Sequence, residues 1–200
     1  MVPANVNRRR SKKMKSQFFV IDDFYDNPDS VRDFALSQEF STYGNYPGVR
    51  TQCASDEHRE YLRQFFEENV VHRPITFWPD GYNTAFQYTT ATDNTWVHHD
   101  STMWAGVLYL TPNPPKGYGT TLYCNKQSGV YEHMDGLYDY NDSSEISGDL
   151  SLWHKEIEVE NRYNRLIVYN GMIYHRSTTA GFGENQHDGR LFQTFFFDTE

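Results

Sequence analysis

The hydrophobic residues of the N-terminal third recur at a helical spacing in two segments. Apolar positions three and four residues apart over 30–40, and again from about 55 to about 70, predict two helices. Asn27 and Pro28 stand before the first segment in the order typical of a helix N-terminus, a capping side chain followed by proline. In the second helix we expect four side chains to face inward: Tyr61, Leu62, Phe65 and Phe66.

From residue 75 onward the pattern changes to short apolar runs separated by glycine, proline and asparagine, and such runs predict β-strands. We expect strands at 82–89, 105–110, 120–123, 165–169, 172–174 and 191–197, with one earlier strand at 18–21. Asn170-Gly171 predicts a hairpin turn between two of these strands, whereas residues 150–158 fit either a short helix or an edge strand. This order predicts a mainly β (α+β) fold, a double-stranded β-helix (jelly roll) braced by N-terminal helices.

The length of the chain, 200 residues, predicts one domain with one hydrophobic core. Residues 1–16 are rich in arginine and lysine, which predicts a mobile basic tail or an arm for an anionic partner. Residues 17–200 are expected to form a single jelly-roll domain. Within it, residues at about 125–148 are rich in Gly, Asp, Ser, Asn and Tyr, which predicts an inserted loop.

Charge and composition exclude several classes of protein. Asp and Glu outnumber Lys and Arg by 27 to 18, which gives a formal net charge of −9, so we expect no binding to duplex nucleic acid. The chain has no apolar run of about 18 residues, and no apolar segment follows its basic N-terminus, so neither a membrane span nor a secretory signal is expected. The only cysteines, Cys53 and Cys124, do not form a Cys-x-x-Cys motif, which favours reduced thiols in a cytoplasmic protein.

Candidate chemistry is concentrated at His98-His99-Asp100. If this run is a strand or a strand end, side chains alternate, so His98 and Asp100 point the same way and His99 points away. An imidazole and a carboxylate side by side provide two ligands of the 2-His-1-carboxylate triad, which binds Fe(II) and leaves coordination positions open. Because short motifs often match polar loops by chance, the third ligand decides between these interpretations.

The third ligand expected is His175, which follows the predicted strand 172–174. A jelly roll brings its first and last core strands together, so a ligand late in the chain can join the earlier pair. A histidine at a strand end is also a common polar cap, and His175 alone therefore proves little.

Arg190 begins the last predicted strand and shares a face with Phe192 and Thr194. An arginine that points inward needs an anionic partner, because an unpaired buried charge costs several kcal/mol. Its planar guanidinium binds a carboxylate through two hydrogen bonds. The alternative is a partly exposed arginine paired with an acidic neighbour.

The order His98-x-Asp100, His175 and Arg190 resembles the Fe(II)/2-oxoglutarate-dependent dioxygenases, in particular the prolyl-4-hydroxylase-like branch with its small uncharacterised members. Further segments at 107–110, 119–121 and 165–170 also resemble that branch. The resemblance covers roughly residues 82–197.

The resemblance implies that His98, Asp100 and His175 bind Fe(II), and that Arg190 holds the distal carboxylate of 2-oxoglutarate. The cofactors would then be Fe(II), 2-oxoglutarate and O₂, and no catalytic residue beyond the metal ligands is implied. Further candidate contacts for 2-oxoglutarate are Tyr88, Thr121 and Thr194, although packing within the sheet explains the first two equally well. The implied reaction hydroxylates a C–H bond of an amino-acid, peptide or small-molecule substrate, with succinate and CO₂ as coproducts.

The chain also departs from that branch. The prolyl hydroxylases usually carry lysine where Arg190 stands, and Tyr118 replaces one glycine of a double-glycine turn. A metal-binding jelly-roll recognition module without turnover therefore stays an alternative, and a hydrolase with Zn²⁺ in the same triad is a third. The rival histidine ligands lack a partner at the required spacing: His99, His133, His154 and His187.

Overall fold

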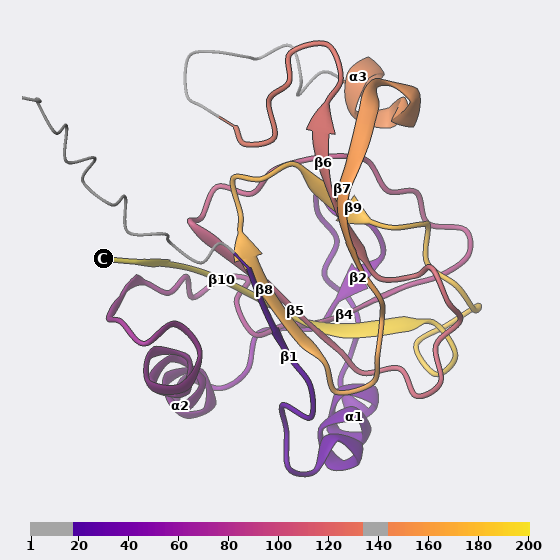
Figure 1. The fold of residues 1–200 in the computed structure, drawn as a ribbon. Helices are drawn as coiled ribbons and strands as arrows, with labels where there is room; N and C mark the ends of the chain where they lie inside the picture. The colour runs from indigo at the N-terminus through magenta and orange to yellow at the C-terminus, as the bar shows by residue number, and fades with distance from the viewer. Residues whose placement is uncertain (1–17, 134–143) are drawn as a thin grey trace, which may run out of the picture.

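The computed structural model describes residues 18–133 and 144–200 (Figure 1). The basic tail predicted at 1–16 and the central part of the loop predicted at 125–148 lie outside these residues. Among the described residues, no helix combines the length and the apolar character that crossing a membrane requires.

Both predicted helices are present, and capping side chains define their N-termini. Helix α1 spans Pro28–Ser37, and the side chain of Asn27 accepts a hydrogen bond from the backbone N–H of Ser30 at 3.2 Å. Helix α2 spans Asp56–Phe66 and continues as a short π-helical segment, Glu67–Val71. The prediction for Tyr61 is wrong, because 59% of this residue is exposed.

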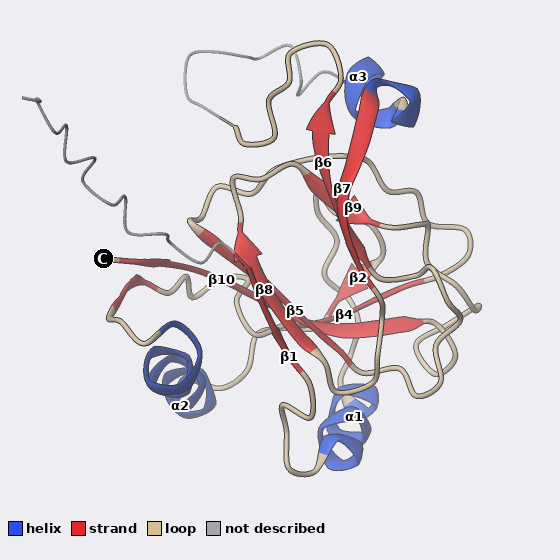
Figure 2. Cartoon of the chain, in the orientation of Figure 1, coloured by secondary structure: helices blue, strands red, loops and turns tan. Residues whose placement is uncertain are grey.

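The strands form two antiparallel sheets (Figure 2). The larger sheet has the order β1-β8-β5-β10-β4-β2, with β3 paired to the far end of β10, and the smaller sheet has the order β7-β6-β9. The strands of the larger sheet are β1 (Phe18–Ile21), β2 (Val49–Arg50), β3 (Ile75–Phe77), β4 (Phe86–Thr89), β5 (Trp104–Tyr109), β8 (Leu166–Asn170) and β10 (Arg190–Thr199). Those of the smaller sheet are β6 (Thr120–Asn125), β7 (Trp153–Val159) and β9 (His175–Ser177).

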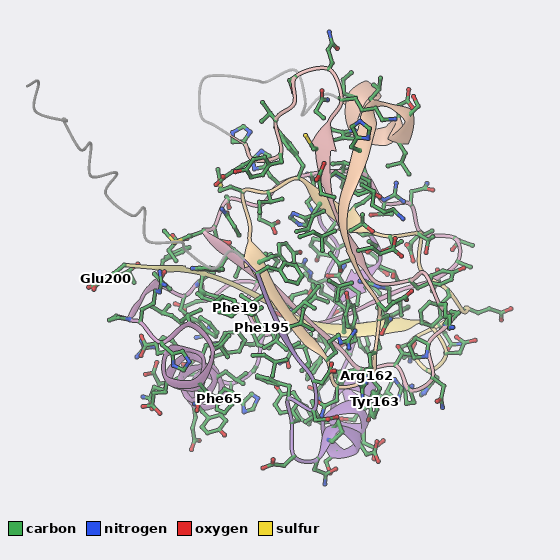
Figure 3. The ribbon with its side chains drawn as sticks, viewed as in Figure 1. Phe19, Phe65, Arg162, Tyr163, Phe195 and Glu200 are labelled. Atoms are coloured by element: carbon green, nitrogen blue, oxygen red, sulfur yellow. The ribbon has the colours of Figure 1, made fainter. Side chains whose placement is uncertain are left out.

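The main hydrophobic core lies between the larger sheet and the N-terminal helices, on the side of the sheet away from β6, β7 and β9 (Figure 2). Leu62 and Phe66 from α2 pack there against Phe195 and Phe197 of β10, and Phe66 and Phe195 have ring centroids 4.7 Å apart. Figure 3 shows Phe195 together with Phe19 from β1 in this region. Since side chains alternate along a strand, the even-numbered residues of β10 face the other way.

The expected hairpin between 165–169 and 172–174 is wrong. Asn170 instead holds a turn, with its side chain accepting from the N–H of Met172 at 2.9 Å and its carbonyl accepting from the N–H of Ile173 at 3.1 Å. The turn carries the chain from β8 in the larger sheet to β9 in the smaller sheet, and so His175 begins a strand rather than ending one.

The ambiguous segment 150–158 contains both of the expected structures, a 3₁₀ turn at Leu150–Leu152 followed by the edge strand β7. The part of the predicted loop that is described includes the short helix α3 (Ser144–Gly148).

Candidate metal centre

Backbone pairing between distant segments brings the metal-ligand candidates together. His98 lies in the segment before β5 and forms an isolated antiparallel bridge with His175, the first residue of β9. The N–H of His98 donates to the carbonyl of His175 at 2.9 Å, and the N–H of His175 donates back at 2.7 Å. These main-chain bonds set the relative position of the two histidines before any ligand binds.

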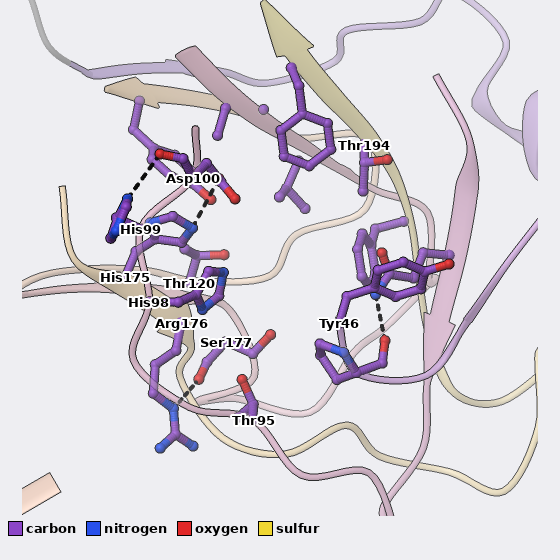
Figure 4. A pocket seen from close by; sticks show the side chains of 18 of the residues that line it. Tyr46, Thr95, His98, His99, Asp100, Thr120, His175, Arg176, Ser177 and Thr194 are labelled. Atoms are coloured by element: carbon purple, nitrogen blue, oxygen red, sulfur yellow. Dashed lines mark hydrogen bonds and ion pairs between the residues drawn. The ribbon is translucent and has the colours of Figure 1, made fainter. Parts of the chain in front are cut away.

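His98, Asp100 and His175 direct one potential ligand atom each to a common point, and these atoms all lie within 4.8 Å of one another. Figure 4 shows the three side chains converging at one end of the cavity. His99 also lines the cavity but is not part of this cluster, and its ring stacks on that of His133 with centroids 3.8 Å apart. The other rival ligands, His154 and His187, are exposed.

The orientation of both imidazoles suits metal binding through Nε2. Nδ1 of His98 lies 3.0 Å from the carbonyl oxygen of Trp96, and Nδ1 of His175 lies 2.7 Å from that of Ile173. A carbonyl only accepts hydrogen bonds, so the hydrogen of each neutral ring is held at Nδ1. The lone pair at Nε2 is then available, which is the arrangement that outer partners impose on metal-binding histidines.

The protonation states also fit a divalent cation. Burial, with a smaller effect of His175, lowers the pKa of His98 to about 4, so its ring is neutral at pH 7. Burial acts to raise the pKa of Asp100, but the interactions with His175 and His98 outweigh it, and the pKa lies below its ordinary value. A neutral imidazole beside an ionised carboxylate is the form that binds metal ions.

The triad opens into a cavity of about 560 Å³. This volume falls within the range of roughly 300–1,000 Å³ typical of small-molecule sites. One face of β10 contributes Arg190, Phe192, Thr194 and Phe196 to the lining, so the predicted alternation along this strand is confirmed.

Arg190 is a buried cation in this cavity, with 2% of its surface exposed. Its Nε donates to the carbonyl of Tyr118 at 3.0 Å, and Nη2 donates to the carbonyl of Gly119 at 3.3 Å. Its Cζ lies 4.4 Å from the centre of the Phe192 ring, and burial lowers the pKa of the guanidinium. No carboxylate within the described part of the chain forms an ion pair with Arg190. The alternative of a partly exposed, acid-paired arginine is therefore wrong.

Among the other candidates, Thr194 lines the cavity, whereas Tyr88 and Thr121 lie outside it. Tyr88 packs against Phe40 with ring centroids 5.0 Å apart, and the hydroxyl of Thr121 pairs with that of Thr178 at 2.8 Å. The neighbours Gln87 and Thr120 face the cavity in their place. The physical reason is the period of two along a strand, since a shift of one residue reverses the face.

Sequence reasoning missed several residues around the two ends of the cavity. The hydroxyls of Tyr109 and Thr120 share a hydrogen bond of 2.8 Å, and the Tyr109 ring lies 5.3 Å from Cζ of Arg190. Tyr169 packs edge-on against His175, with ring centroids 4.7 Å apart. At the other end, Arg50 lines the cavity. The alternation along β5 and β8 carried a signal for the two tyrosines, but nothing in the sequence distinguished Arg50.

Comparisons with known proteins identify a matching family and several similar folds. A family model described as "Family of unknown function (DUF6445)" matches residues 3–197. No curated protein matches the sequence. A solved structure with a similar fold is HygX from Streptomyces hygroscopicus with nickel, 2-oxoglutarate and hygromycin B bound. It is 13% identical over 91% of this chain and 82% of that chain, with a TM-score of 0.59.

Two prolyl hydroxylases are similar as well. A prolyl-4-hydroxylase from Pseudomonas putida is 16% identical over 92% of this chain and 93% of that chain, with a TM-score of 0.53. A prolyl hydroxylase from Trichoplax adhaerens, in complex with a hypoxia inducible factor peptide fragment, is 14% identical over 90% of this chain and 83% of that chain, with a TM-score of 0.54. At such identities the likeness establishes the fold alone. The predicted double-stranded β-helix is confirmed, and the resemblance to Fe(II)/2-oxoglutarate dioxygenases is confirmed at the level of the fold.

Proposed function

We propose that this chain, which belongs to the DUF6445 family of unknown function, is an Fe(II)- and 2-oxoglutarate-dependent oxygenase. The observation that carries the proposal is the convergence of His98, Asp100 and His175 within 4.8 Å at one end of a cavity that also contains the buried Arg190. The substrate is an amino acid, a peptide or another small molecule, and the reaction hydroxylates one of its C–H bonds.

The donor set suits Fe(II). Nε2 of His98, Nε2 of His175 and a carboxylate oxygen of Asp100 would hold the metal, and three protein ligands leave room for further ligands on a six-coordinate ion. When bound, Fe(II) with 2-oxoglutarate and O₂ supplies the oxidising chemistry, and 2-oxoglutarate leaves as succinate and CO₂. The task of the protein is to bind and orient the reactants.

Arg190 is assigned to the distal carboxylate of 2-oxoglutarate. Burying a guanidinium without a counter-charge costs several kcal/mol, and a carboxylate ligand supplies that charge with a matching planar geometry. The two carbonyls that accept from Arg190 keep its guanidinium in place, and Phe192 covers one of its faces. Thr120, whose hydroxyl hydrogen-bonds that of Tyr109, provides a polar group that lines the cavity, and Thr194 lines it four residues further along β10.

Two measurements test the proposal. Anaerobic addition of Fe(II) and 2-oxoglutarate is expected to produce a weak visible charge-transfer band, and admission of air is expected to release succinate. A chain that gives neither the band nor succinate is not an oxygenase of this kind. Metal binding without succinate release, with candidate substrates present, would instead favour a recognition module without turnover.

A further inference from the structure

A second guanidinium, that of Arg50, enters the cavity from strand β2. Arg50 pairs with Gln87 of β4 in the register of the larger sheet, and both side chains line the cavity. Arg50 also stacks on Tyr46, with Cζ 3.7 Å from the ring centre. Figure 4 shows Tyr46 across the cavity from the metal-ligand candidates.

The guanidinium of Arg50 is held in one orientation. Its Nε donates to Oε1 of Gln87 at 2.7 Å, and the amide nitrogen of Gln87 donates to the carbonyl of Pro47 at 2.6 Å. The Tyr46 ring covers one face, and the Phe196 ring lies 5.7 Å from Cζ. The terminal nitrogens Nη1 and Nη2 form no hydrogen bond with the residues described. A pre-oriented fork with free donors is what bidentate binding of a carboxylate requires.

No carboxylate in the described ranges forms an ion pair with Arg50 either. Asp100 acts on it only through space, and Asp100 is committed to the metal site. Three other arginines differ, since Arg59, Arg63 and Arg165 each pair with a carboxylate at 2.6–2.8 Å. Burial lowers the pKa of Arg50, because no anion among the described residues fully balances its positive charge. An anionic ligand would supply the missing negative charge.

Arg50 and Arg190 approach the same face of β10 in different places. The backbone register aligns Arg50 with Gln87 and Gln87 with Phe192, and from there the Arg50 guanidinium lies toward the Phe196 ring. The guanidinium of Arg190 instead lies over Phe192 and donates to the carbonyls of Tyr118 and Gly119. A cosubstrate carboxylate held by Arg190 would leave Arg50 for a second anion, and the 2-oxoglutarate affinity of Arg50→Gln tests this separation.

We propose that Arg50 binds a carboxylate of the primary substrate, and that the substrate is a small carboxylic acid or the C-terminal residue of a peptide. The inference rests on the proposed function, because it takes the Arg190 end of the cavity as the 2-oxoglutarate site. A single guanidinium with two free terminal nitrogens matches one carboxylate in charge and in geometry. The carboxylate fixes one end of the substrate at Arg50 and directs the rest of the molecule toward the metal.

The test measures binding rather than turnover. The protein is loaded anaerobically with Mn²⁺ and 2-oxoglutarate, and titrated calorimetrically with free L-amino acids, with their primary amides, and with acetylated tripeptides that carry the same C-terminal residues. We expect at least one acid to bind and its amide to bind at least tenfold more weakly. Binding of the free acid alone identifies a metabolite, whereas equal binding of the tripeptide identifies a peptide C-terminus.

Variants assign the effect to Arg50. Arg50→Gln should lower the affinity for the carboxylic acid at least tenfold and change the affinity for 2-oxoglutarate by much less. Arg50→Lys should retain part of the acid affinity, since it keeps the charge but loses the fork. Arg162→Gln is the matched control, because it removes the same charge from an exposed arginine that pairs with Asp22, and it should bind the acid as the wild type does.

Four results would overturn the inference: no acid binds, acid and amide bind equally, Arg50→Gln keeps the acid affinity, or Arg50→Gln weakens 2-oxoglutarate tenfold. The last result would assign Arg50 to the cosubstrate. Binding of 2-oxoglutarate to the Mn²⁺-loaded wild type is measured first. If 2-oxoglutarate does not bind, the proposed function is wrong. If 2-oxoglutarate binds but no acid does, only the inference about Arg50 is wrong.

Discussion

Nε2 of His175 lies 3.3 Å from a carboxylate oxygen of Asp100, although Asp100 precedes β5 and His175 begins β9. The contact directs both potential ligand atoms to the point that His98 also faces. Because main-chain hydrogen bonds between His98 and His175 support this contact, we expect the site to keep its shape without a metal.

Substitution within and beside the triad should separate metal ligands from neighbours. His98→Ala or His175→Ala is expected to reduce Mn²⁺ affinity by at least about 100-fold, more than the loss of an outer partner costs, because a ligand atom disappears. His99→Ala is the matched control, since its ring lies outside the three-residue cluster and stacks on His133. Calorimetric titration measures both. Equal losses in His98→Ala and His99→Ala would contradict the assignment.

Arg190→Met should lower the affinity for 2-oxoglutarate and leave metal binding unchanged. Loss of one partner of a buried charge pair costs about 2–5 kcal/mol, so the affinity of the Mn²⁺-loaded protein for 2-oxoglutarate should fall by more than tenfold. Mn²⁺ affinity, measured in the same titration series without 2-oxoglutarate, should stay within error. A variant with unchanged 2-oxoglutarate affinity would remove Arg190 from the cosubstrate site.

Metal binding should stabilise the native state. A ligand present at about 100 times its Kd adds about 2.7 kcal/mol when it binds only the folded protein, so Mn²⁺ should raise the Tm measured by calorimetry. The Asp100→Ala variant should show little of this increase, because it lacks one of the three ligand atoms. An equal Tm shift in the variant and the wild type would indicate metal binding elsewhere.

Two adjacent threonines offer a test of the strand register. Thr120 faces the cavity and hydrogen-bonds Tyr109, whereas Thr121 pairs with Thr178 outside it. Thr120→Val should weaken the binding of 2-oxoglutarate by the contribution of one hydrogen bond, roughly 0.5–1.5 kcal/mol. Thr121→Val should leave the Kd for 2-oxoglutarate unchanged. The reverse result would mean that β6 presents its other face to the cosubstrate.

The core between α2 and the larger sheet should matter for stability and not for the site. Phe66 is fully buried against Phe195 and Phe197, so Phe66→Ala should lower the free energy of unfolding by about 3–5 kcal/mol. Tyr61→Ala, on the exposed side of the same helix, should cost less than about 1 kcal/mol. Urea denaturation measures both values, and similar losses would place the core elsewhere.

The sequence was sufficient to predict the fold class and the shared direction of His98 and Asp100, whereas His175 joined the predicted ligands through the resemblance to a known family. His98 and Asp100 are two positions apart, so their shared direction follows from the local geometry of extended backbone. The same period of two predicted the inward face of β10 that contains Arg190 and Thr194. These features depend on neighbours in sequence, and so they can be read from it.

Tertiary structure decided what depends on pairing between distant segments. The turn at Asn170 sends His175 into the second sheet, and strand register selects Thr120 over Thr121 and Gln87 over Tyr88. Arg50 stands in a strand of two residues without any periodic signal, and only its pairing with Gln87 brings it to the cavity. Register is set by long-range hydrogen bonds and packing, and a shift of one residue would reverse every one of these side chains.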